Sequence, residues 1–205
     1  MCVGRGNAYP QQDYWIVIYE NSADLDSATA NMNIEGAICR LRALEPSDLE
    51  VMYGWENDVD LWRVSGATAP FSRHQLSTLI VEQQYDIYAT RQLRLVVEAE
   101  VEGAMQTIGA VDLFEFNPQC RRAGVGIIIS SKYRRKGYAL DALQCVERYA
   151  REVLMLHQLW CSVAADNQAS LRLFERAGYE QCGIRRDWIL TTEGAVAEVL
   201  FQKIL

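Results

Sequence analysis

The sequence of 205 residues predicts a mixed α/β (α+β) domain, in which helices cover both faces of a mostly antiparallel central sheet. Residues 94–130 hold three strand-like segments joined by short turns, which is the pattern of an antiparallel meander. Residues 139–154 place apolar side chains at three- and four-residue steps, which indicates an amphipathic helix. Because 50% of the residues are hydrophobic, the chain can bury one core of ordinary size.

Residues 1–37 differ in composition from the rest of the chain. Small and polar residues are frequent there, and one strand-like hexamer at 14–19 interrupts them. The segment holds one arginine and five acidic residues, so it carries −4 of the net charge of −7. We expect a poorly packed N-terminal extension over residues 1–37 and one folded domain over residues 38–205.

The first elements of the domain combine a strand with two helices. Residues 38–44 alternate apolar and polar side chains in the manner of a strand. Pro46 fits the first turn of a helix that extends to about Trp55, and the acidic residues near it suit the helix dipole. Ser72 is a suitable N-cap for a second helix over residues 74–89.

The centre of the chain reads as an antiparallel meander. Residues 94–100 and 107–116 form a predicted hairpin with its turn at 102–103, and residues 121–130 run back after a loop. The remaining predicted elements are a strand at 157–164, a helix that begins near Asn167 and that Gly178 ends, and a final hairpin of residues 183–190 and 195–204.

A short basic loop, residues 134–139, joins the strand at 123–130 to the amphipathic helix. Such a loop exposes backbone N–H groups at a helix N-terminus, where the helix dipole favours phosphate oxygens. Gly137 lets the backbone approach a ligand because it has no Cβ. The loop therefore predicts a cradle for a diphosphate. Its cationic side chains are Lys132, Arg134, Arg135 and Lys136.

The pattern of this loop separates it from two common phosphate-binding loops. The sequence contains no Gly-x-x-x-x-Gly-Lys-[Ser/Thr], and no Gly-x-Gly-x-x-Gly follows a strand. Residues 134–139 fit [Arg/Gln]-x-x-Gly-x-[Gly/Ala], which resembles the acetyl-CoA loop of the GNAT N-acetyltransferase superfamily. Residues 167–179 resemble the superfamily's Asn-x-x-[Ser/Ala]-x-x-Leu-Tyr-Glu-[Lys/Arg]-x-Gly-[Phe/Tyr] helix at the expected separation. The resemblance covers roughly residues 38–205.

The resemblance is closest to the branch that holds spermidine and ribosomal-protein N-terminal acetyltransferases. It implies a transferase that uses acetyl-CoA as co-substrate and binds its pantetheine arm along the strand before the loop. The alternatives without a ligand are an ordinary buried strand before the loop and a purely structural N-cap at Asn167. The implied acetyl-CoA contacts are Ile127, Ile128, Ile129, Arg134, Arg135, Lys136, Gly137, Tyr138, Ala139, Asn167 and Ser170.

Acetylation of an amine requires a base, because an ammonium group with a pKa near ~10 must first lose a proton. A carboxylate that acts through water is the usual candidate. Glu56, Asp112 and Glu115 are the candidate bases, although an acid in such a position is more often a surface or structural acid than a base. Asp112 and Glu115 face opposite sides of a regular strand unless a bulge intervenes. Phe174 stands where the superfamily pattern has a tyrosine that protonates the CoA thiolate.

Three functions remain open at this stage. The first is acetylation of a small primary amine such as a polyamine, which the acidic run at 56–60 slightly favours. The second is acetylation of a peptide or protein N-terminus. The third, which Phe174 keeps open, is binding of acetyl-CoA with little turnover.

Composition excludes several other classes. No apolar run reaches the ~18 residues of a membrane span and no leader pattern is present, so we expect a cytoplasmic protein without a membrane partner. The acidic net charge argues against nucleic-acid binding. The six cysteines form no Cys-x-x-Cys, which predicts scattered reduced thiols and no metal site. Homo-oligomerisation is left open.

Overall fold

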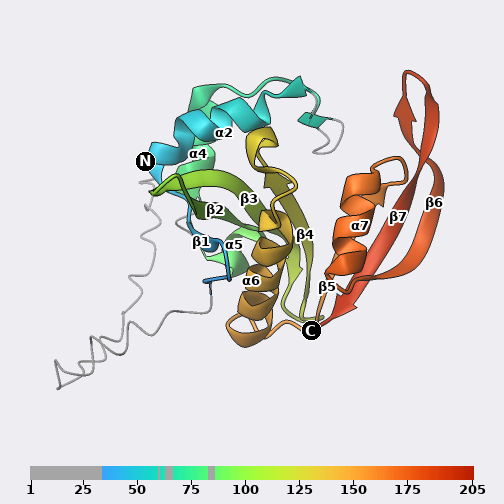
Figure 1. The fold of residues 1–205 in the computed structure, drawn as a ribbon. Helices are drawn as coiled ribbons and strands as arrows, with labels where there is room; N and C mark the ends of the chain where they lie inside the picture. The colour runs from blue at the N-terminus through green and yellow to red at the C-terminus, as the bar shows by residue number, and fades with distance from the viewer. Residues whose placement is uncertain (1–33, 60, 63–66, 83–85) are drawn as a thin grey trace, which may run out of the picture. The chain divides into compact units, whose positions relative to one another are not determined.

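The computed structural model describes residues 34–59, 61–62, 67–82 and 86–205. These residues form a sheet with the strand order β1-β2-β3-β4-β5-β7-β6, in which the pairing of β4 with β5 is parallel and the others are antiparallel (Figure 1). The strands are β1 (Arg40–Ala43), β2 (Leu93–Val101), β3 (Ala104–Asn117), β4 (Arg122–Ile129), β5 (Gln158–Ala164), β6 (Glu180–Thr191) and β7 (Gly194–Ile204). The helices are η1 (Pro46–Asp48), α2 (Leu49–Glu56), α4 (Arg73–Glu82), α5 (Ile87–Thr90), η2 (Ser131–Tyr133), α6 (Tyr138–Glu152) and α7 (Gln168–Arg176).

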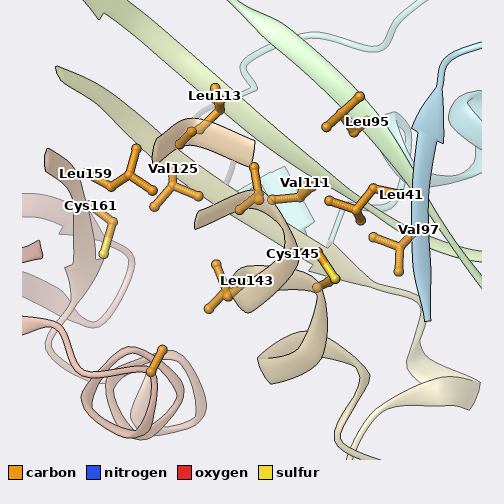
Figure 2. Packing of buried hydrophobic residues seen from close by; sticks show 14 of the residues in the cluster. Leu41, Leu95, Val97, Val111, Leu113, Val125, Leu143, Cys145, Leu159 and Cys161 are labelled. Carbon is orange, nitrogen blue, oxygen red and sulfur yellow. The ribbon is translucent and has the colours of Figure 1, made fainter. Parts of the chain in front are cut away.

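Helices cover both faces of the sheet, as the sequence predicts. Alternate residues of a strand point to opposite faces. Leu95 of β2 accordingly belongs to the same buried cluster as Leu143 of α6, whereas Val96 is buried with Met52 of α2 and Leu76 of α4. Figure 2 shows the larger cluster, in which residues of β1 to β5 meet α6. Its labelled members are Leu41, Leu95, Val97, Val111, Leu113, Val125, Leu143, Cys145, Leu159 and Cys161.

The strands β4 and β5 diverge after a short parallel pairing. Residues 122–124 of β4 pair with residues 158–160 of β5, and β5 then pairs along its whole length with β7. From residue 125 to 129, β4 keeps its antiparallel partner β3 but pairs with no other strand of the described residues. One edge of β4 is therefore open, and this open edge leads directly into η2 and the basic loop.

The second predicted helix differs from the observed one. The single helix expected over residues 74–89 is α4 followed by the separate short helix α5. The side chain of Asp86 accepts a hydrogen bond from the N–H of Ala89 and caps α5, so Asp86 marks a new helix start rather than the interior of one helix. Residues 83–85 lie outside the described part of the chain.

Residues 34–37, which the sequence analysis assigned to the extension, are bonded to the domain. The carboxylate of Asp141 in α6 accepts hydrogen bonds from the backbone N–H groups of Ala37, Ile38 and Cys39, at 2.9, 2.8 and 2.9 Å. Ile34 packs against the larger buried cluster. The ordered domain thus begins several residues before residue 38. Residues 1–33 lie outside the described residues, and the extension there stays a prediction.

All the described cysteines are free, but two of them lie close together. Cys39, just before β1, and Cys145 of α6 lie with Asp141 so that one ligand atom of each is within 4.8 Å of the others. No local sequence pattern indicates this proximity, because the two cysteines come from separate elements. Cys120, Cys161 and Cys182 are also unbridged.

The hydrogen bonds that Asp141 accepts should contribute measurably to the stability of the folded domain. Burial alone disfavours its charge, but the backbone N–H groups of Ile38, Ala37 and Cys39 outweigh burial and lower its pKa below the ordinary 3.8. We expect Asp141→Asn to reduce the free energy of unfolding at neutral pH by about 1.5–3 kcal/mol, the worth of hydrogen bonds to a charged group. Because the folded pKa is lowered, this stability is present above pH 3.8 and is lost as the pH falls through the folded pKa.

Urea titrations at neutral pH and at successively lower pH measure this effect. The matched control is Glu152→Gln on the same helix, because Glu152 pairs with Arg151 on the surface and such pairs contribute about 0–1 kcal/mol. Equal losses for the two variants, or a loss for Asp141→Asn that does not shrink in acid, would contradict this account of Asp141.

Candidate functional site

The basic loop presents unused backbone donors at the start of α6. The N–H groups of residues 135–139 donate to no acceptor among the residues that the structure describes. Gly137 is the N-cap of α6 with a φ of 92°, and Arg135 also has a positive φ of 64°. Together with the dipole of the 15-residue helix, these N–H groups favour the binding of an anion. This geometry fits the diphosphate that the sequence predicts.

Cationic side chains surround the same loop. Lys132, Arg134, Arg135 and Lys136 are all exposed. The Nε of Arg134 donates to the carbonyl of Ile129 at 2.9 Å and so joins the loop to the end of β4. The ammonium groups of Lys132 and Lys136 lie 4.6 and 5.8 Å from the centre of the Tyr133 ring. These contacts leave full positive charges beside the N–H groups.

The open edge of β4 exposes the backbone of alternate residues. The N–H of Ser130 donates to the carbonyl of Ile108 in β3 at 2.9 Å, so the peptide groups of Ser130 and Ile128 face β3. Those of Ile127 and Ile129 face the open edge, and the carbonyl of Ile129 accepts from Arg134 there. Of the three isoleucines that the sequence analysis proposes, Ile127 and Ile129 are thus oriented to pair with an extended arm.

Asn167 and Ser170 lie at the N-terminus of α7. The side-chain oxygen of Asn167 accepts a hydrogen bond from the N–H of Ser170 at 3.1 Å. Asn167 is therefore the N-cap of α7, one of the two roles foreseen for it. Its contact with acetyl-CoA, and that of Ser170, stay predictions.

Two of the three candidate bases meet at an arginine that the sequence analysis did not identify. Arg94 of β2 binds Asp112 through two hydrogen bonds, at 2.7 and 3.0 Å, and also binds Oε1 of Glu56 in α2. Arg94 and Asp112 are paired across β2 and β3, and Asp112 is also in register with Gly126 of β4. The side chains are 17–28% exposed, so solvent reaches this cluster.

This ion cluster lies on the α2 and α4 face of the sheet. Val111 and Leu113 point into the larger cluster on the other face, so Asp112 between them points toward α2. A close indole contact also ties α2 to the end of β4, because Nε1 of Trp55 donates to Oγ of Ser130 at 2.9 Å. The helix that carries Glu56 is thus fixed beside the open edge of β4. The sequence does hold a signal for the position of Arg94. It lies two residues before Val96 in β2, and such residues of a strand point to the same face of the sheet.

Glu115 is separated from the other two acids. A register irregularity between Phe114 and Asn117 interrupts the pairing of β3 with β4, and Glu115 has a positive φ of 49°. Glu115 is exposed and lines a hollow of about 800 Å³ with Arg122 and Trp160, among other residues. The lining includes neither Glu56 nor Asp112. The regular alternation of faces expected for Asp112 and Glu115 is therefore interrupted by a bulge in β3.

Phe174 is part of the core. Its side chain is buried, its ring meets that of Tyr179 edge-on at 5.1 Å, and it stacks on Phe201 at 6.4 Å. Two tyrosines near this helix in the sequence are buried: the hydroxyl of Tyr133 bonds Gln106, and burial raises the pKa of Tyr179 above its ordinary value. Neither of these two is therefore an evident replacement for the tyrosine missing at position 174.

The left-handed backbone of Gly137 gives a test of the cradle. A Cβ in this conformation costs roughly 1–2 kcal/mol, so Gly137→Val should distort the loop and turn its N–H groups away. We expect acetyl-CoA to bind at least about tenfold more weakly to this variant in calorimetry. The matched control is Gly103→Val, since Gly103 has a φ of 80° in the β2–β3 turn, with nothing within 4 Å of its Cβ position. Equal affinities for the two variants would refute the cradle.

Comparisons with known proteins agree with this geometry. The 31% identical spermidine N(1)-acetyltransferase of Escherichia coli K12 aligns over 140 residues, which is 68% of this chain and 72% of that protein. An uncharacterised N-acetyltransferase of Bacillus subtilis, YoaA, is 24% identical over 73% of this chain and 83% of its own length. The fold matches that of spermidine N-acetyltransferase from Vibrio cholerae, solved with CoA and spermine, with a TM-score of 0.73 and 24% identity over 82% of this chain and 96% of that one.

The family assignment follows from a match over most of the domain. Residues 39–180 match the family described as the acetyltransferase (GNAT) domain, and this span contains both motifs that the sequence analysis used. In the described residues, no helix is long and apolar enough to cross a membrane. The family and the fold class predicted from the sequence are confirmed. The chain belongs to the GNAT acetyltransferase family and is an acetyl-CoA-dependent N-acetyltransferase.

Proposed function

We propose that this enzyme acetylates a primary amine of a polyamine. The observation that carries the proposal is the partly exposed cluster of Glu56, Arg94 and Asp112 on the face of the sheet opposite α6, with Asp112 in register with β4. Among the described residues, two carboxylates against one guanidinium give this cluster one net negative charge, which favours a cationic acceptor. The relatives named as spermidine N(1)-acetyltransferases, 31% identical in E. coli and 29% in V. cholerae, support the same acceptor class.

The acidic run that first favoured a polyamine carries less weight than this cluster. Glu56 is paired with Arg94, Asp58 is exposed, and Asp60 lies outside the described residues. The electrostatic attraction therefore rests on the net charge of the cluster rather than on the acidic count of residues 56–60.

The residues of the site fit acetyl-CoA. The N–H groups of residues 135–139 and the surrounding cations hold the diphosphate. The peptide groups of Ile127 and Ile129 pair with the pantetheine arm as an added strand would, and an N–H there stabilises negative charge on the thioester oxygen. When bound, acetyl-CoA supplies the acetyl group as an activated thioester.

Glu56 is the better placed of the candidate bases. Both oxygens of Asp112 accept hydrogen bonds from Arg94, whereas only Oε1 of Glu56 does, so Oε2 of Glu56 is available to a water molecule or to the ammonium group. Asp112 then holds Arg94, and Arg94 holds Glu56 in position. Glu115 is too clearly separated from this cluster to share the role.

Turnover does not require a hydroxyl at position 174. A thiol has a pKa near ~8.5, so a thiolate leaves readily near neutral pH, and a lost general acid costs about 10²–10⁴ in rate only where proton transfer is essential. The third function, binding with little turnover, is therefore less favoured than catalysis. A peptide or protein N-terminus remains the second candidate acceptor, because the described residues leave the cluster open to solvent.

A comparison of acceptors tests the proposed function. We expect release of CoA thiol in the presence of spermidine with a higher kcat/KM than with aminoglycosides, amino acids or short peptides. The preference should weaken as salt screens the charged cluster. Higher kcat/KM for neutral peptides, or no turnover with any polyamine, would move the assignment to the second or third function.

Substitution of Glu56 tests its role as base. Glu56→Gln keeps the hydrogen bond to Arg94 and removes the proton acceptor, so kcat should fall by about 10²–10⁴ while the enzyme still binds acetyl-CoA. The control is Glu50→Gln on the same helix, whose carboxylate pairs only with exposed Arg73. Unchanged kcat in Glu56→Gln would remove Glu56 from the mechanism.

A further inference from the structure

Cys39, Asp141 and Cys145 form a compact buried cluster that the acetyl-transfer site does not use. One ligand atom of each lies within 4.8 Å of the other two. Cys39 is 7%, Asp141 8% and Cys145 0% exposed. The cluster lies at the first two turns of α6, on the side that contacts the segment before β1. It therefore joins two elements that are far apart in the sequence.

The three side chains retain donor capacity. Asp141 accepts three backbone hydrogen bonds, and a carboxylate offers about four lone-pair sites. The carboxylate also interacts with the Cys39 thiol, and that thiol loses its proton when a metal binds. Cys39 makes a weak contact with the carbonyl of Tyr138 at 3.9 Å. Cys145 lies 3.6 Å from the guanidinium of Arg148, which also donates to the carbonyl of Glu35. The thiols of Cys39 and Cys145 also interact with each other, and the thiol of Cys39 interacts with Asp141.

We propose that Cys39, Cys145 and Asp141 bind a zinc ion that ties the segment before β1 to α6. Two sulfur ligands and one carboxylate oxygen are a donor set that Zn²⁺ accepts, and water or the carbonyl of Tyr138 completes a tetrahedron. Each thiol releases its proton to the solvent when its sulfur coordinates the ion.

Charge balance supports this assignment. Two thiolates and one carboxylate carry −3, which Zn²⁺ and the adjacent Arg148 neutralise. A neutral cluster is the condition under which ions are tolerated in a protein interior. Zn–S bonds of about 2.3 Å place tetrahedral ligands roughly 3.8 Å apart, so the ligand atoms, which lie within 4.8 Å of one another, need to draw together by at most about 1 Å. Rotation of the two cysteine side chains can supply such a movement.

Cobalt is a direct probe, because Co²⁺ replaces Zn²⁺ in such sites and its spectrum reports thiolate ligands. The full chain, reduced and kept free of oxygen, is titrated with Co²⁺. We expect about one ion per chain, a thiolate-to-cobalt charge-transfer band and the visible bands of a tetrahedral ion. Cys39→Ala and Cys145→Ala should each lose most of the charge-transfer band. Zn²⁺ should displace Co²⁺ and raise the Tm of the wild-type chain.

The matched control is the triple variant Cys2→Ser, Cys120→Ser and Cys182→Ser, which keeps the cluster and should keep the full band. Circular dichroism without metal shows whether each alanine variant is folded. If an alanine variant does not fold, the wild-type and triple-variant spectra decide the question. A spectrum without thiolate bands in the wild-type chain, loss of the bands in the triple variant, or full bands in a folded Cys145→Ala chain would each overturn the proposal.

Discussion

Strand β4 pairs with β5 over only three residues before the two strands diverge. Because only residues 122–124 of β4 pair with β5, the next residues keep unpaired peptide groups on one edge. An unpaired edge invites an added strand. The same strand continues through η2 into the loop that begins α6, so one continuous segment offers both strand-like pairing and an anion site.

Arg94 performs the equivalent task on the other face. Glu56 and Asp112 would repel each other if both were charged and close, and Arg94 removes this repulsion by binding both. It also connects α2 to β2 and β3, and so holds a helix against the sheet beside the open edge. The same residue thus serves the packing of α2 and the arrangement of the acids, so its substitution should affect both.

Local patterns made the loop, the two motifs and the fold class predictable. The 134–139 loop and the Asn167 cap depend on residues adjacent in the chain, which the sequence displays directly. The Arg94 cluster and the Asp141 contacts join residues from separate elements, so no local pattern announces them. The side on which Glu115 lies depends on a bulge, because one irregular residue changes the face of everything after it.

The hydrogen bond from Arg134 to Ile129 has a consequence for selectivity. It fixes the anion-binding loop at a set distance along β4 from Gly126, which neighbours Asp112 in the register of the sheet. At about 3.4 Å per residue, this strand defines the reach between a bound diphosphate and the acids on the opposite face. If the loop binds the diphosphate as proposed, the span of β4 sets how long a thioester donor must be to reach the acids from that loop.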